Sequence, residues 1–90
     1  MIKRYKIIFK GSVQGVGFRW TACNAASMYR LTGYVRNEYD GSVTCEVQGK
    51  DEEIDRFIAA IQSGRFIDIT DIERRELPVD EEERGFDVKF

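Results

Sequence analysis

The sequence of 90 residues contains no histidine, one proline and two cysteines. Histidine is the side chain that most often acts as a general base or binds zinc near neutral pH, so its absence argues against many base-dependent and metal-dependent sites. Cys23 and Cys45 are too few for a disulfide framework or a structural zinc site. We therefore expect no metal and no cofactor, with both thiols packed as small hydrophobic groups. A disulfide between them is disfavoured in a reducing compartment.

The sequence also lacks an apolar run long enough to cross a membrane, and residues 1–6 lack the apolar core of a secretory signal. A chain of 90 residues suits one domain, which we assign to residues 1–90. Its hydrophobic content of 42% is typical of a packed globular protein. We predict a cytoplasmic protein that binds no membrane. Because no residue pattern demands an oligomer, we expect a monomer.

Charge is unevenly distributed along the chain, although the net charge is only −2. Residues 1–48 carry seven basic and three acidic side chains, whereas residues 49–90 carry seven basic and thirteen acidic ones. The basic first half suits an anionic ligand. The acidic total argues against a general nucleic-acid-binding protein.

Residues 11–19, Gly-Ser-Val-Gln-Gly-Val-Gly-Phe-Arg, form a glycine-rich stretch between a predicted strand and a predicted helix. Successive N–H groups in such a bend, beside a helix N-terminus, bind anions, and Arg19 adds planar donors that suit phosphate. The stretch is not a Walker A loop, and the third glycine of a dinucleotide-binding loop would fall at Trp20. A glycine-rich turn without a ligand is the alternative. We predict an anion site built from the backbone of Gln14, Gly15, Val16, Gly17, Phe18 and Arg19.

The rest of the sequence predicts strands and helices in a definite order. Apolar residues at strand spacing predict strands at residues 5–9, 33–37, 43–48, 67–72 and 85–90, and apolar residues at helical spacing predict helices at residues 18–31 and 51–64. We expect Gly33 to stop the first helix, Asp51 to cap the second and Gly64 to end it. Asp40-Gly41 predicts a tight turn, and the acidic run at residues 80–83 predicts an exposed loop.

This order of elements is typical of the α+β ferredoxin-like fold, a split βαβ sandwich (βαββαβ). Right-handed crossovers predict an antiparallel sheet of strand order 4-1-3-2 with two helices on one face. The first and second strands then run in the same direction, so their C-terminal ends share one edge of the sheet. Asn37 ends the second strand, and we expect it about 10 Å from the glycine-rich stretch, within reach of a bound phosphate. Trp20 and Tyr39 either rim this site or pack elsewhere.

The motifs around this edge are similar to those of a known family. Val13-Gln14-Gly15-Val16 with Phe18-Arg19, followed by Gly33-Tyr34-Val35-Arg36-Asn37 and Asp40-Gly41-Ser42-Val43, closely resembles the acylphosphatases, and the resemblance spans essentially the whole chain. It implies a hydrolase of acyl phosphates in which Arg19 binds the phosphate of the substrate and Asn37 positions the attacking water. One departure is Arg65 after Gly64, where the family often has a proline. This departure affects the expected path of that loop and not the chemistry.

The chemistry also fits a chain with few catalytic side chains. An acyl phosphate releases a carboxylate with a pKa of about 4, which needs no general acid. The site then has to hold the phosphoryl oxygens, balance their charge and direct a water molecule in line. We therefore predict metal-independent hydrolysis of a small-molecule acyl phosphate to a carboxylate and inorganic phosphate.

Two other functions occur on folds of this kind. An RNA-binding module would present aromatic side chains on its middle strands, but residues 42–48 contain none, so we expect no nucleic-acid partner. A non-hydrolytic phosphate-binding or carbamoyl-phosphate-binding module, as found within larger carbamoyl-transfer enzymes that resemble this family, is the second alternative. A hydrolase turns over a simple acyl phosphate and a binding module does not, so an assay of turnover distinguishes the two.

Overall fold

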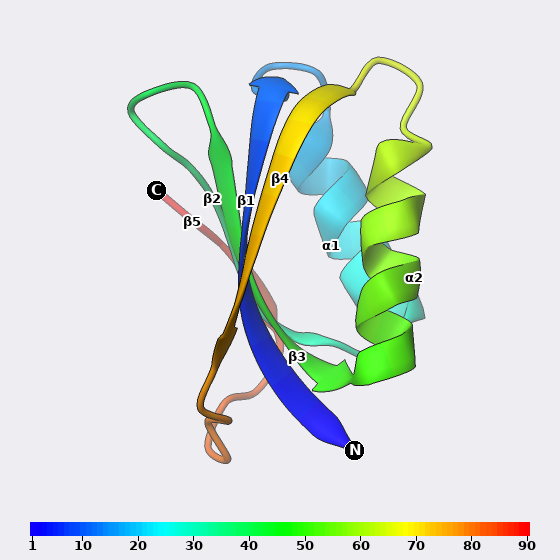
Figure 1. Cartoon of the computed structure of the whole chain (residues 1–90), viewed down its shortest axis with the longest axis vertical. Coiled ribbons are helices and arrows are strands. Elements are labelled where there is room, and N and C mark those ends of the chain that lie inside the picture. The colour runs from blue at the N-terminus through cyan, green and yellow to red at the C-terminus, as the bar shows by residue number, and fades with distance from the viewer.

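A five-stranded sheet carries both helices on one of its faces in the computed structural model, which describes residues 1–90 (Figure 1). The strands are β1 (Ile2–Ser12), β2 (Thr32–Asn37), β3 (Val43–Lys50), β4 (Asp68–Leu77) and β5 (Phe86–Lys89), and the helices are α1 (Phe18–Met28) and α2 (Asp51–Gln62). Neither helix combines the length and the apolar character needed to cross a membrane.

The strand order is β4-β1-β3-β2-β5. The predicted order of the first four strands is confirmed, but the prediction of a purely antiparallel sheet is wrong, because β5 pairs with β2 in parallel. The pairing begins where the N–H group of Gly33 donates to the carbonyl of Gly85, at 2.9 Å. The outer edge of β2 would otherwise expose unpaired backbone groups, and the last strand satisfies them.

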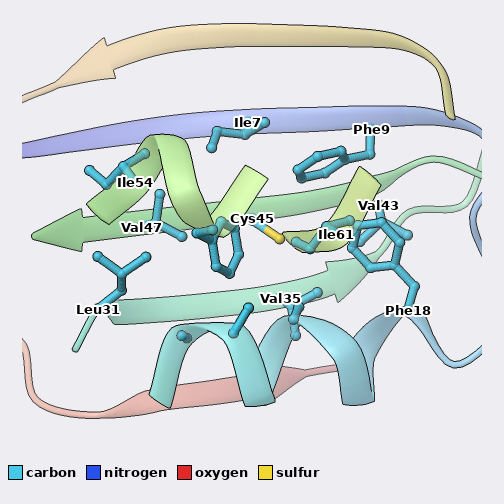
Figure 2. Close-up of a cluster of buried hydrophobic side chains, with 14 of the residues drawn as sticks. Ile7, Phe9, Phe18, Leu31, Val35, Val43, Cys45, Val47, Ile54 and Ile61 are labelled. Atoms are coloured by element: carbon cyan, nitrogen blue, oxygen red, sulfur yellow. The ribbon is translucent and has the colours of Figure 1, made fainter. Parts of the chain in front are cut away.

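The core lies between the sheet and the two helices. Alternate residues of β1 and β3, such as Ile7, Phe9 and Val47, are fully buried and point toward Ile54 and Ile61 of α2 (Figure 2). The predicted apolar faces of these elements are therefore confirmed. Cys45 is also fully buried in this core, while Cys23 is partly buried beside it, and both thiols are free. Burial raises the pKa of both thiols, in keeping with their expected role as small hydrophobic groups.

The first helix ends earlier than predicted. Tyr29 follows its last residue, and Arg30 adopts the left-handed conformation at φ 58° that usually falls to glycine after a helix. The N–H group of Leu31 then donates to the carbonyl of Ala26, at 2.9 Å, which closes the end of the helix. Gly33 instead lies inside β2, with φ 138°, where a β-carbon would overlap the carbonyl of Glu46 in the neighbouring strand. The close approach of two strands, and not the helix end, requires this glycine.

The second helix begins at Asp51, so the prediction that Asp51 caps it from outside is wrong. Its carboxylate lies 3.6 Å from the ammonium group of Lys3 and 3.4 Å from the guanidinium of Arg74, and it accepts a hydrogen bond from the hydroxyl of Tyr5. The negative charge still stabilises the positive end of the helix dipole. The helix ends at Gln62, two residues before Gly64, close to the predicted end.

A hydrogen-bonded ion network lies on the sheet face that the helices leave open. The buried guanidinium of Arg4 contacts Glu46 at 2.9 Å and Glu83 at 2.6 Å, and Tyr34 donates to Glu46 at 2.6 Å. Burial and this hydrogen bond raise the pKa of Tyr34 to about 12. Burial opposes ionisation of Glu46, but hydrogen bonds from Tyr34 and Arg4 outweigh it and lower its pKa. Glu83 is therefore tied to the sheet, although the rest of the predicted acidic loop is exposed.

Candidate active site

The glycine-rich loop joins β1 to α1 at the upper end of the molecule in Figure 1, the same end as the β2–β3 turn. Gly15 and Gly17 have φ 73° and 79°, and a β-carbon at either position would meet no atom within 4 Å. The left-handed backbone conformation, and not crowding, therefore requires glycine at both positions. Phe18 follows at once and packs edge-on against Phe9, with ring centroids 5.0 Å apart. This aromatic contact fixes the start of α1 against β1.

The N–H groups of residues 14–19 donate no hydrogen bond within the chain. The first N–H groups of any helix lack a partner inside the helix, and Gly17 supplies no side chain to cap α1. Backbone N–H groups are strong donors that need an acceptor, and at a helix N-terminus they favour an anion. The loop therefore offers a set of unused donors at the positive end of the helix dipole.

Arg19 is the second residue of α1 and forms none of the eight ion pairs of the chain. Its guanidinium carbon lies 5.5 Å from the centre of the Phe90 ring. An arginine above an aromatic ring keeps the N–H groups at its edge available for other acceptors. The site thus contains one positive charge without a carboxylate partner.

Asn37 is the last residue of β2, where it pairs with Val43 of β3. Its side-chain oxygen Oδ1 is buried and has no hydrogen-bond partner, the one such side-chain atom in the chain. Buried polar atoms are almost always hydrogen-bonded, so an orphaned acceptor of this kind indicates a site for a donor such as water or a ligand.

These groups surround one cavity of about 210 Å³, lined by Val13, Gly15, Gly17, Phe18, Arg19, Trp20 and Asn37. The fold thus brings Arg19 and Asn37 to the same cavity. Gln14 and Val16 do not line it, and neither does the fully exposed Tyr39. A larger cavity of about 430 Å³ lies between the end of α1 and the start of α2, but no unpartnered buried polar atom faces it. We therefore assign the candidate site to the smaller cavity.

Few side chains at this cavity can take part in acid–base or metal chemistry. Arg19 is its only ionisable side chain, and the chain contains no group of three or more His, Cys, Asp or Glu side chains that could hold a metal ion. The carboxyl groups closest to Asn37 in sequence belong to Glu38 and Asp40, and neither lines the cavity. A hydrogen bond from Thr44 lowers the pKa of Glu38, and hydrogen bonds from Ser42 lower that of Asp40. Both stay ionised near neutral pH, so neither is suited to act as a general acid.

The side chain of Gln14 has a role that the sequence did not reveal. Its amide nitrogen Nε2 donates to the carbonyl of Glu38 at 2.7 Å and to the carbonyl of Ser42 at 2.9 Å. These two residues flank the predicted Asp40-Gly41 turn, which is confirmed. One side chain therefore holds the glycine-rich loop against the turn that follows Asn37. The position of Phe90 above Arg19 was also not predicted, since Phe90 is the residue that follows β5, far from Arg19 in sequence.

Comparison with known proteins identifies close relatives. The family model for acylphosphatase matches residues 5–88. The acylphosphatase of Oceanobacillus iheyensis is 42% identical over 91 residues, which cover 99% of this chain and 100% of that protein. The crystal structure of acylphosphatase from Bacillus subtilis matches with a TM-score of 0.91 and 34% identity over 100% of both chains. Full-length HypF in the phosphate- and nucleotide-bound form matches with a TM-score of 0.90 and 34% identity, over 100% of this chain but 12% of that one.

Replacing Gln14 with alanine removes both hydrogen bonds to the β2–β3 turn. Because each such bond contributes about 1 kcal/mol, we expect the free energy of unfolding in urea to fall by about 1–2 kcal/mol. Gln62→Ala is the matched control, since Gln62 is exposed and its side chain forms no hydrogen bond. That control should change the stability by less than about 0.5 kcal/mol. Equal stability of the two variants would contradict the structural role of Gln14.

Proposed function

Because the chain belongs to the acylphosphatase family and is an enzyme that hydrolyses acyl phosphates, we propose that its active site is the cavity between the glycine-rich loop and Asn37. Relatives that match along their full length are acylphosphatases, which favours hydrolysis over the non-hydrolytic binding module left open by the sequence. The observation that carries the assignment is the meeting of unused donors and an unused acceptor around one cavity.

The donors suit the phosphoryl group of the substrate. The loop N–H groups and the guanidinium of Arg19 bind its non-bridging oxygens, which carry the negative charge. Charge-assisted hydrogen bonds of this kind strengthen in a site that excludes water. Val13 and Phe18 are buried apolar residues of the cavity lining, and they help to exclude water from it.

The acceptor suits the attacking water. The buried Oδ1 of Asn37 accepts a hydrogen bond from that water and so directs a lone pair of the water oxygen toward phosphorus. A new P–O bond forms to the water oxygen, while the P–O bond to the acyl group breaks and its electron pair leaves with the carboxylate. No general acid is required, because the leaving group has a pKa of about 4. The proton of the water passes to a phosphoryl oxygen, since the cavity holds no ionisable base. No step in this mechanism uses a metal ion.

Arg19→Ala removes the only positive charge that lines the cavity. We expect kcat/KM for benzoyl phosphate to fall by about 10³-fold or more, and competitive inhibition by inorganic phosphate to weaken. Assays with a chelator present should give the same native rate. Arg65→Ala is the matched control, because Arg65 is exposed and lies outside the cavity. Retention of phosphate inhibition in Arg19→Ala would contradict the phosphate-binding role.

Asn37→Ala removes the acceptor for the water but leaves the loop and Arg19 in place. We expect kcat for benzoyl phosphate to fall by about 10²-fold, with inhibition by inorganic phosphate changed by no more than about twofold. A fall in kcat without a change in phosphate inhibition distinguishes the water-positioning role from phosphate binding. Asn24→Ala, at an exposed position of α1, should retain the native rate. A native kcat in Asn37→Ala would exclude the proposed role.

We also propose that the protein works as a monomer in the cytoplasm. The outer strand β4 carries charged side chains along most of its length, a feature that opposes pairing of sheet edges between molecules. The two free cysteines suit a reducing compartment. Sedimentation velocity should give one species with the mass of a single chain, and a stable dimer at assay concentrations would contradict this proposal.

A further inference from the structure

We propose that Trp20 binds the acyl part of the substrate, so that the enzyme favours acyl phosphates with aromatic or extended apolar acyl groups over acetyl phosphate. This inference rests on the proposed active site. It concerns the one large apolar side chain of the cavity lining that is not part of the core.

Trp20 is the third residue of α1 and follows Arg19 directly. Trp20 lines the cavity and yet remains 72% exposed, whereas Val13 and Phe18 of the same lining are buried. The indole also takes part in no aromatic pair and no cation–π contact within the chain. A large aromatic surface left in water beside a binding cavity gains free energy when a ligand covers it.

The direction of the reaction indicates which part of the substrate reaches Trp20. In-line attack places the water and the leaving group on opposite sides of phosphorus. Asn37, which directs the water, lies at the end of the sheet strand β2, whereas Trp20 belongs to the helix wall of the cavity. With the phosphoryl group on the loop N–H groups, the acyl group leaves the cavity on its open side, where Trp20 is the exposed apolar residue of the lining.

Phe90 is the alternative contact for the acyl group, and the structure argues against it. Its ring already lies over the guanidinium of Arg19, at 5.5 Å, and it does not line the cavity. The parallel register pairs Lys89 with Arg36, so Phe90 follows at the level of Asn37, beside the strand that holds the attacking water. The leaving group points away from that side.

The test compares kcat/KM for benzoyl, butyryl and acetyl phosphate. We expect the native enzyme to favour benzoyl phosphate over acetyl phosphate, and Trp20→Ala to reduce this ratio by about tenfold, chiefly through KM. Trp20→Phe should restore most of the preference, because it keeps an aromatic face. Phe66→Ala is the matched control, since Phe66 is also 72% exposed but lies outside the cavity, and it should keep the native ratio.

The outcomes separate this inference from the proposed function. An unchanged benzoyl-to-acetyl ratio in Trp20→Ala, or a loss of the ratio in Phe90→Ala instead, would overturn the acyl contact while leaving hydrolysis at this site intact. Turnover of acetyl phosphate that persists in Arg19→Ala would instead contradict the proposed active site itself. A cooperative unfolding transition in urea verifies that Trp20→Ala is folded. A loss of structure is then not mistaken for a loss of the benzoyl-to-acetyl preference.

Discussion

Two hydrogen bonds from the amide of Gln14 hold together the two segments that form the proposed active site. They reach the carbonyls of Glu38 and Ser42, which lie 24 and 28 residues further along the chain. The loop that forms the proposed phosphate site and the strand that ends at Asn37 belong to different segments. A displacement of about 1 Å between them would misalign an in-line attack. A neutral, half-buried side chain between the two segments therefore fixes the geometry without adding charge to the site.

The fold makes this tie possible because β1 and β2 run in the same direction with β3 between them. Both strands end at the same end of the sheet, so the β1–α1 loop and the β2–β3 turn meet there (Figure 1). The core lies beneath them, between the sheet and the helices, and supplies the stability. The residues at this end can therefore adopt left-handed backbone conformations and leave polar groups without hydrogen-bond partners. A packed core tolerates neither feature.

The proposed reaction needs only a few groups from the protein. In the proposed mechanism, one positive charge, a set of backbone donors and one side-chain oxygen are sufficient for a substrate whose leaving group departs as a stable carboxylate. The strongly interacting charges of the protein lie elsewhere, in the network of Arg4, Glu46 and Glu83 on the open face of the sheet. That network fastens the β4–β5 loop to the sheet a few residues before β5, which pairs with β2.

Sequence patterns alone were enough to predict the kinds and approximate positions of the helices and strands, the order of the first four strands and the meeting of Arg19 and Asn37 beside the glycine-rich loop. These properties follow from local patterns, because hydrophobic period, turn residues and chain direction act over a few positions at a time. Three features become visible only in the folded chain: Gly33 allows two strands to approach closely, β5 pairs in parallel with β2, and Gln14 joins the loop to the turn. The fold also places Arg4 against Glu83, 79 residues away. Such contacts depend on which polar groups happen to face one another across the folded sheet, and no local period in the sequence records them.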